Sequence, residues 1–230
     1  ESMLTNVSGQ YNTALGSSAL LANTTASNNT AIGRQSLTAN TTGTANTAVG
    51  IGSLKTTISG GYNTAVGMNA CSLTTAADNT GLGYGALQTN SSGINNTAVG
   101  GMALYTSTTA AKNTAVGYEA LYLNTTGAYN TAVGEGALIA NTTGADNVAV
   151  GTEALQTNTT ASYNTAVGAY ALYTATGVSN AAVGRSALFY NTSGGYNTAM
   201  GHNAGYQVTT GIDNTFLGFY AGGYGTSYVA

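Results

Sequence analysis

The chain has no proline and no tryptophan, one cysteine, one histidine and very few charged residues. Proline cannot donate a backbone hydrogen bond, so its absence from 230 residues suits a chain whose amides are nearly all paired. The single cysteine, Cys71, excludes an intrachain disulfide and is expected to be a small buried apolar residue. Four Lys and Arg against seven Asp and Glu give a net charge of −3, which argues against a nucleic-acid partner.

Residues that carry chemistry are equally sparse. His202 has no second histidine or cysteine with which to complete a metal site. No base is placed to activate a serine, and no phosphate-binding glycine loop occurs. No apolar run is long enough to cross a membrane. We therefore expect a non-enzymatic protein without cofactor or metal, and no membrane insertion of this segment.

What the chain does contain is one short unit, repeated throughout. Its clearest copy is NTAVG at 130–134, followed by Ala137, Leu138 and NTTG at 141–144. The glycine of NTAVG occurs thirteen times, at intervals of 17 residues ten times and 16 twice. This period predicts an all-β parallel β-solenoid (β-roll) of thirteen 17-residue rungs. We expect a partial repeat over 1–11 and one thirteen-repeat domain over 12–230, with atypical C-terminal rungs over 197–230.

Positions in a rung are numbered from its asparagine, so that Asn is position 1 and the glycine is position 5. Regular glycines and β-branched residues disfavour helix and predict two short β segments per rung. One lies at NTAVG and the other runs from Ala-Leu at positions 8 and 9 into the next Asn-Thr. The asparagines in register are expected to pass amide hydrogen bonds along the stack. All charged residues fall at positions 6, 7, 10 and 17, which we therefore expect to form the solvent-exposed corners of the rung.

Alternation along a strand places positions 2 and 4, Thr and a large apolar residue, on one face. We expect this Thr and Val face to line the interior, together with the leucine at position 9. The opposite face then carries alanine at position 3 in eleven rungs, which is too small and regular for a free surface. It predicts close packing of a second chain, with a tight corner inside one chain as the alternative.

The segment 146–151, DNVAVG, resembles the N-S-V-A-I-G motif of the YadA-like head of trimeric autotransporter adhesins. The NTAVGxxAL…NTTG form is similar to repeats of bacterial and phage tail-fibre-like proteins. The resemblance implies a left-handed roll, a homotrimer and an extracellular, cell-surface or virion tail-fibre location. It also implies a host-surface protein or glycan as a partner besides the chain itself. The rung is longer than in such heads, and the shared residues are structural, so no binding residue carries over.

Tyrosine is the residue type best suited to binding, because it offers an apolar face and a polar tip. Its copies gather at positions 10 and 17 of the rung. The ligand-binding candidates, for a sugar ring or a partner protein, are Tyr105, Tyr122, Tyr129, Tyr163, Tyr173, Tyr196 and Tyr206. The alternative is that these rings only cover the corners of the roll or seal an interchain contact.

These features predict a structural and adhesive fibre segment that presents its variable corner residues to a surface or a glycan. The alternative is an ice-binding Thr/Asn-rich solenoid with outward threonines at positions 13 and 14, for which the regular T-x-T spacing is missing. A polysaccharide-degrading solenoid is disfavoured because no carboxylate cluster recurs beside an aromatic groove.

Ten Asn-x-Ser/Thr sequons accompany the repeat, and we interpret them as its by-products rather than as glycosylation sites. They begin at Asn6, Asn23, Asn28, Asn40, Asn90, Asn95, Asn124, Asn141, Asn158 and Asn191.

Overall fold

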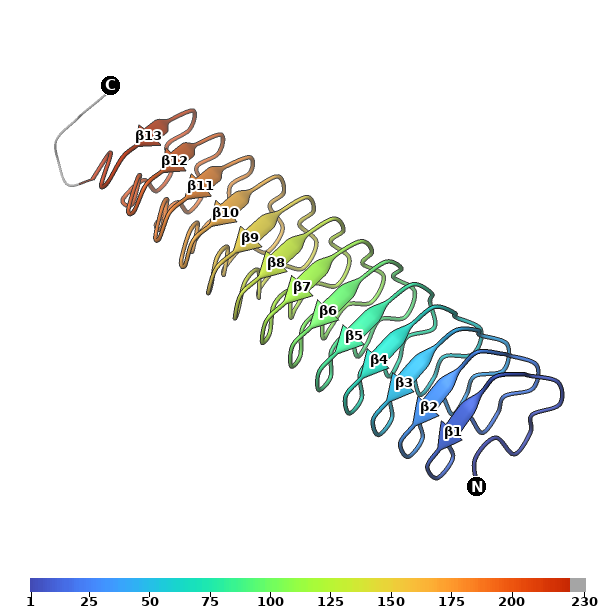
Figure 1. The fold of residues 1–230 in the computed structure, drawn as a ribbon. Helices are drawn as coiled ribbons and strands as arrows, with labels where there is room; N and C mark the ends of the chain where they lie inside the picture. The colour runs from blue at the N-terminus through green and yellow to red at the C-terminus, as the bar shows by residue number, and fades with distance from the viewer. Residues whose placement is uncertain (224–230) are drawn as a thin grey trace. The chain divides into compact units, whose positions relative to one another are not determined.

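The computed structural model describes residues 1–223, in which each rung contributes one three-residue strand and no helix is present (Figure 1). The strands are β1 (Thr13–Leu15), β2 (Thr30–Ile32), β3 (Thr47–Val49), β4 (Thr64–Val66), β5 (Thr80–Leu82), β6 (Thr97–Val99), β7 (Thr114–Val116), β8 (Thr131–Val133), β9 (Val148–Val150), β10 (Thr165–Val167), β11 (Ala181–Val183), β12 (Thr198–Met200) and β13 (Thr215–Leu217). The chain forms two compact units, 1–113 with β1 to β6 and 114–230 with β7 to β13.

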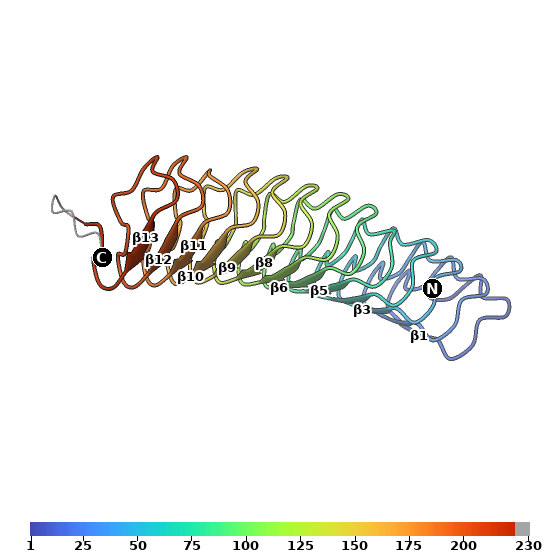
Figure 2. The same cartoon turned by 90° about the horizontal axis from the view of Figure 1, so that it is seen from above.

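Within each unit, neighbouring strands are parallel and like positions stand opposite each other, which Figures 1 and 2 show as rungs in chain order. Thr47 pairs with Thr64 and Val49 with Val66, for example. A 16-residue rung keeps this register, because Thr64 pairs with Thr80 and the missing residue is lost from the connecting loop. The predicted all-β parallel solenoid with a repeat of about 17 residues is confirmed. That 12–230 is one domain stays a prediction.

The second β segment, expected from position 8 onward, is not a strand. Instead the backbone adopts left-handed conformations at positions 7 and 9, with φ of 55° at Glu119 and 53° at Leu121. These alternating residues turn the chain sharply, which an extended strand does not do. Hydrogen bonds between rungs continue here all the same, as in Leu138 N–H to Ala154 O at 3.0 Å.

The predicted faces of the strand were wrong. Alanine at position 3 points inward and is fully buried, as at Ala132 and Ala166. Leucine at position 9 is also fully buried, as expected, and it fills the interior from the opposite wall. This leaves space for only a methyl group on the strand side, so the larger Thr and Val side chains point outward. The small alanines therefore reflect a narrow core and give no evidence of a second chain.

The glycine at position 5 is required by its conformation and by its neighbour. Gly134 has a φ of +136°, which L side chains rarely adopt. A Cβ placed there would lie 2.5 Å from the carbonyl oxygen of Gly151 in the next rung. The glycines at position 5 thus allow the backbones of successive rungs to lie in direct contact at this turn.

The predicted asparagine ladder is confirmed at position 1. Asn147 donates its backbone N–H to Asn130 Oδ1 at 3.0 Å, and its side-chain Nδ2 to Ala161 O at 2.9 Å. Asn164 continues the pattern by donating its N–H to Asn147 Oδ1 at 2.9 Å. Each buried asparagine therefore bonds to the neighbouring rung and also to a carbonyl oxygen of its own rung. These bonds satisfy backbone N–H and C=O groups that water does not reach.

A second asparagine ladder, at position 12, was missed from the sequence. Asn141 Nδ2 donates to Asn124 Oδ1 at 2.8 Å, and Asn158 Nδ2 donates to Asn141 Oδ1 at 3.2 Å. The ladder ends wherever the following rung lacks asparagine. Asn158 is followed by Ala175 and Asn191 by Val208, and both asparagines have a buried Oδ1 without a partner in the described residues.

The C-terminal rungs, predicted to be atypical, exchange large and small residues in the core. Gly205 and Gly222 stand where other rungs have leucine, and Phe216 stands where they have alanine. A Cβ on Gly205 would lie 2.9 Å from the ring of Phe216, and one on Gly222 only 2.4 Å from it. The phenyl ring thus takes the space that the leucines give up. Cys71 and Gly81 do not follow this exchange, because both are smaller than the usual leucine and alanine, although a Cβ on Gly81 would lie 2.5 Å from Cys71 Sγ.

Candidate ligand-binding surfaces

The seven predicted tyrosines divide into three groups. Tyr129, Tyr163 and Tyr196, at position 17, are 54%, 65% and 62% exposed. They stand on every second rung of their unit, with Asp146 and Ser179 at the same position between them. This spacing prevents a continuous aromatic ladder at that corner. Tyr196 also lines a hollow of about 440 Å³, together with Val178 and Ile212.

Tyr105 and Tyr122, at position 10, lie outside the aromatic cluster described next. Both are partly buried. In the second unit, Ile139 and Gln156 occupy position 10 of the two rungs after Tyr122. The structure therefore does not bring Tyr122 into contact with the later tyrosines of its column.

Tyr173 and Tyr206 are brought together by Phe189, which lies between them in the column at position 10. The rings of Tyr173 and Phe189 are stacked, with centroids 4.8 Å apart and planes 3° from parallel. Phe189 and Tyr206 are stacked at 5.3 Å. Offset or stacked aromatic rings at these distances attract each other. The structure therefore assembles a cluster from two of the seven candidates.

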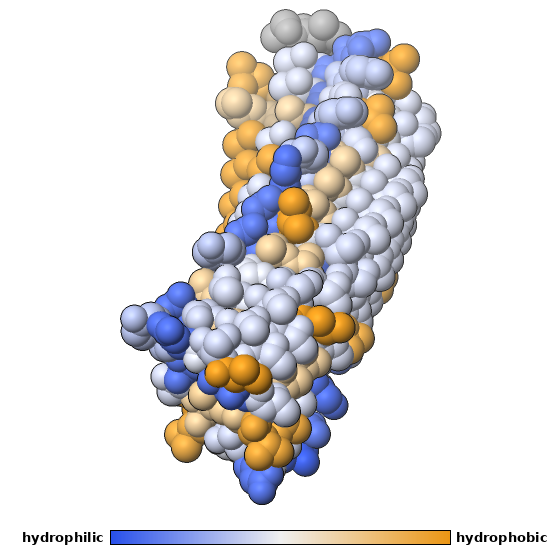
Figure 3. Space-filling model, turned by 90° about the vertical axis from the view of Figure 1, so that its right-hand side faces the viewer, coloured by the Kyte–Doolittle hydropathy of each residue, from blue (hydrophilic) through white to orange (hydrophobic). Residues whose placement is uncertain are grey.

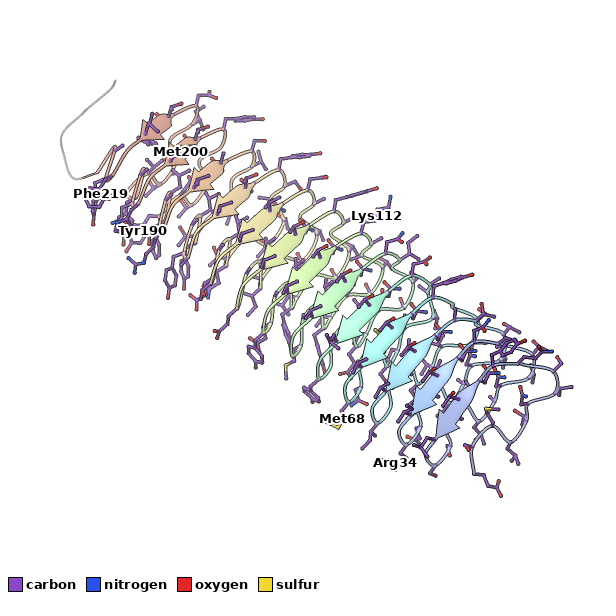
Figure 4. The ribbon with its side chains drawn as sticks, viewed as in Figure 1. Arg34, Met68, Lys112, Tyr190, Met200 and Phe219 are labelled. Carbon is purple, nitrogen blue, oxygen red and sulfur yellow. The ribbon has the colours of Figure 1, made fainter. Side chains whose placement is uncertain are left out.

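Three further tyrosines, which sequence reasoning did not select, complete the cluster. Tyr190 meets Tyr206 edge to face at 5.1 Å, and Tyr170 lies 6.0 Å from Tyr173. The third, Tyr220, lies within 6.2 Å of His202 and 4.8 Å of Phe219. Tyr190 and Phe219 project from the loops at the end of the second unit in Figure 4. Reading positions 7 and 11 beside position 10 would have found these residues.

Part of this cluster lines an open hollow of about 510 Å³, here called the aromatic groove. Its walls are Tyr170, Tyr173, Phe189, Tyr206 and Tyr220, and its polar lining is Arg185, Ser186 and Asn203. The guanidinium carbon of Arg185 lies 5.9 Å from the centroid of the Tyr170 ring, a cation–π distance. Arg185 Nη1 also lies 3.5 Å from His202 Nε2.

A different surface is formed by the outward residues of the strands, here called the Thr/Val face and defined as positions 2 and 4 of each rung. In the second unit, Val133, Val167 and Val183 are 36–38% exposed. No charged residue occupies either position. On the side drawn in Figure 3, strongly hydrophilic residues occupy narrow rows between broad areas of neutral colour. The Thr/Val face is thus a mildly apolar strip without charged residues.

The Cys71 thiol and the Tyr118 hydroxyl both have raised pKa values, which makes them poor nucleophiles at neutral pH. Burial raises the pKa of the Cys71 thiol to about 12, so it stays protonated at neutral pH. A hydrogen bond to Glu119 raises the pKa of the Tyr118 hydroxyl, which likewise keeps its proton. Within residues 1–223, no three His, Cys, Asp or Glu side chains gather closely enough to hold a metal ion.

Neither a protein-family model nor a curated protein matches this chain. In the part that the structure describes, no helix is long and apolar enough to span a membrane. What supports a function is therefore the geometry of the two surfaces above.

Proposed function

We propose that the chain is a structural and adhesive segment of an extracellular fibre, on a cell surface or a virion tail, and that it assembles with copies of itself. The observation that carries the proposal is the Thr/Val face. Its apolar and neutral side chains recur at the same two positions of every rung, and no charge interrupts them in the described residues. An apolar, uncharged strip repeated along a unit favours association rather than solvation.

The resemblance to YadA-like heads and tail-fibre-like repeats adds the finer features. It favours three chains over two and a left-handed roll. The interface differs from the one expected from the sequence, because the alanines at position 3 are buried in the core. The Thr/Val face takes their place as the contact between chains. The corners at positions 6, 7, 10 and 17 then remain outside, where their variable residues meet a surface protein or a glycan.

Light scattering on the intact chain tests this assembly. We expect a mass of three chains at micromolar concentration. Val133→Lys with Val167→Lys places two charges on the Thr/Val face and should yield monomers with unchanged circular dichroism. Thr143→Lys with Thr160→Lys adds the same charges at exposed position 14 of the same unit and should leave the trimer intact. A folded monomer for the unmodified chain contradicts the proposal.

Ice binding remains the second candidate because threonines do recur on the outside. Position 14 is exposed, as at Thr143 and Thr160. At position 13, however, the hydroxyl is used within the stack, as in Thr142 Oγ1 to Thr159 O at 3.0 Å. Only one of the two neighbouring threonine columns is thus free to order water. We expect no thermal hysteresis at micromolar protein, and a clear hysteresis would favour this candidate over the fibre.

A further inference from the structure

We propose that the aromatic groove binds an acidic saccharide, that is, a sugar unit carrying a carboxylate. This inference rests on the proposed display of corner residues by a fibre and assigns one such corner its ligand class. The groove lies in the second unit, over the rungs of β10 to β13, and its volume of about 510 Å³ is within the roughly 300–1,000 Å³ typical of small-molecule sites.

The aromatic side chains supply an apolar wall. In the column at position 10, Tyr173, Phe189 and Tyr206 stack on one another, so they present their edges and hydroxyls along the groove. At position 7, Tyr170 and Tyr220 stand at the two ends, and the two rungs between them carry Ser186 and Asn203 instead. Large rings at both ends and small residues between them leave a recess that is open to a ring-shaped ligand.

Polar groups in the floor of this recess point to a ligand. Ser186 and Asn203 are only 5% and 6% exposed. Neither the Ser186 hydroxyl nor the Asn203 amide is among the fully buried polar atoms that lack a partner in the described residues, so both groups face the open side of the groove. Water in the groove can hydrate these groups, and sugar hydroxyls can replace that water because they both donate and accept hydrogen bonds.

The positive charge of Arg185 favours a saccharide that carries a carboxylate. Among the described residues, Arg185 is the only formally charged one that lines the groove. Its contact with the Tyr170 ring holds the guanidinium at the rim, and a guanidinium fork pairs with a planar carboxylate through two hydrogen bonds. The acidic residues of the same corner, Glu119, Glu135 and Glu153, belong to rungs before that of Tyr170. None of them lines the groove to neutralise Arg185.

Calorimetric titration of the full chain tests the site, with 3′-sialyllactose against lactose and digalacturonate against its methyl ester. The first pair tests a sialic acid and the second a uronic acid. Because the chain has no tryptophan, tyrosine fluorescence reports binding independently. We expect at least one acidic probe to bind about tenfold or more tightly than its neutral counterpart.

Arg185→Gln should remove that preference, and Phe189→Ala should weaken binding of the acidic probe by a similar factor. Arg34→Gln is the matched control, because Arg34 occupies the same position 6 in the first unit, where position 10 carries Thr38. Thermal melting checks that each variant is folded. Equal binding of acidic and neutral probes, or unchanged binding by Arg185→Gln, overturns the proposal.

The test separates this inference from the proposed fibre. A trimeric wild-type chain that binds neither acidic probe overturns the saccharide site and leaves the fibre standing. A monomeric wild-type chain that binds an acidic probe with the expected Arg185 dependence supports the site and overturns the fibre.

Discussion

The second unit fills its interior in two ways. In the rungs of β7 to β11, a leucine at position 9 lies against alanine-sized residues at position 3 of the strands. In the rungs of β12 and β13, position 9 is Gly205 or Gly222, and the ring of Phe216 fills the space from the strand side. Between Gly205 and Phe216, position 9 of one rung loses about as much side-chain volume as position 3 of the next rung gains, as expected for a close-packed core.

The largest expected effect comes from placing a charge in the leucine column. Leu121→Asp should lower the free energy of unfolding by more than about 4 kcal/mol, because an unpaired carboxylate would be buried between rungs. Leu123→Asp is the matched control, since Leu123 belongs to the same rung and is 40% exposed. It should change stability by less than about 0.5 kcal/mol. Chemical denaturation measures both, and equal losses would contradict the assignment of inside and outside.

The next effect concerns the backbone, which both core types share. Gly134→Ala should cost about 3 kcal/mol, because of its positive φ and the close Gly151 carbonyl. Gly201→Ala, in the rung of β12, should cost the same, since its φ is +134° and a Cβ would lie 2.5 Å from Gly218 O. Gly136→Ala should cost only about 1 kcal/mol, because its φ of +64° is tolerated by other residues at that position. If Gly134→Ala and Gly201→Ala lower the free energy of unfolding by different amounts, the leucine-filled rungs and the rungs of β12 and β13 differ in more than their cores.

A double substitution should convert one core type into the other. Phe216→Ala alone removes a half-buried ring and should cost about 2 kcal/mol. Gly205→Leu alone should also destabilise, because its Cβ would lie 2.8 Å from Leu188 Cδ2 and 2.9 Å from the phenyl ring. Combined, the two restore the leucine and alanine pair, and the φ of +64° at Gly205 is close to the 47° to 54° of leucines at that position. The double variant should recover more than half of the loss, and simple additivity would contradict the volume exchange.

The smallest effect is a gain in stability at the interrupted ladder. Val208→Asn supplies a donor for Asn191 Oδ1, which has no partner in the described residues. We expect about 1 kcal/mol of added stability. Val178→Asn, at an exposed position of the same unit, is the control and should add nothing. Equal shifts in melting temperature would mean that the orphaned oxygen does not limit the stability of this region.

The repeat predicted the parallel solenoid, the buried leucines and the first asparagine ladder, because these follow from period and residue type alone. The faces of the strand were not predictable in this way. Alternation shows only that Thr and Val share a face, and the choice of face depends on how much space Leu121 and its equivalents leave. The groove was missed for a related reason: Tyr170 and Tyr220 occupy position 7, not position 10, and only the turns at positions 7 and 9 bring these two columns together.

The buried asparagines at position 12 have a practical consequence for producing the protein. Seven of them, including Asn124, Asn141 and Asn158, begin Asn-x-Ser/Thr sequons, yet all seven are buried with 0% exposure. A glycan attached there in a eukaryotic secretory host would have to enter the core, so modified chains should misfold. Asn28 and Asn95 are exposed and would accept a glycan without this conflict. A host without N-glycosylation should therefore yield more folded material from this sequence than a eukaryotic secretory one.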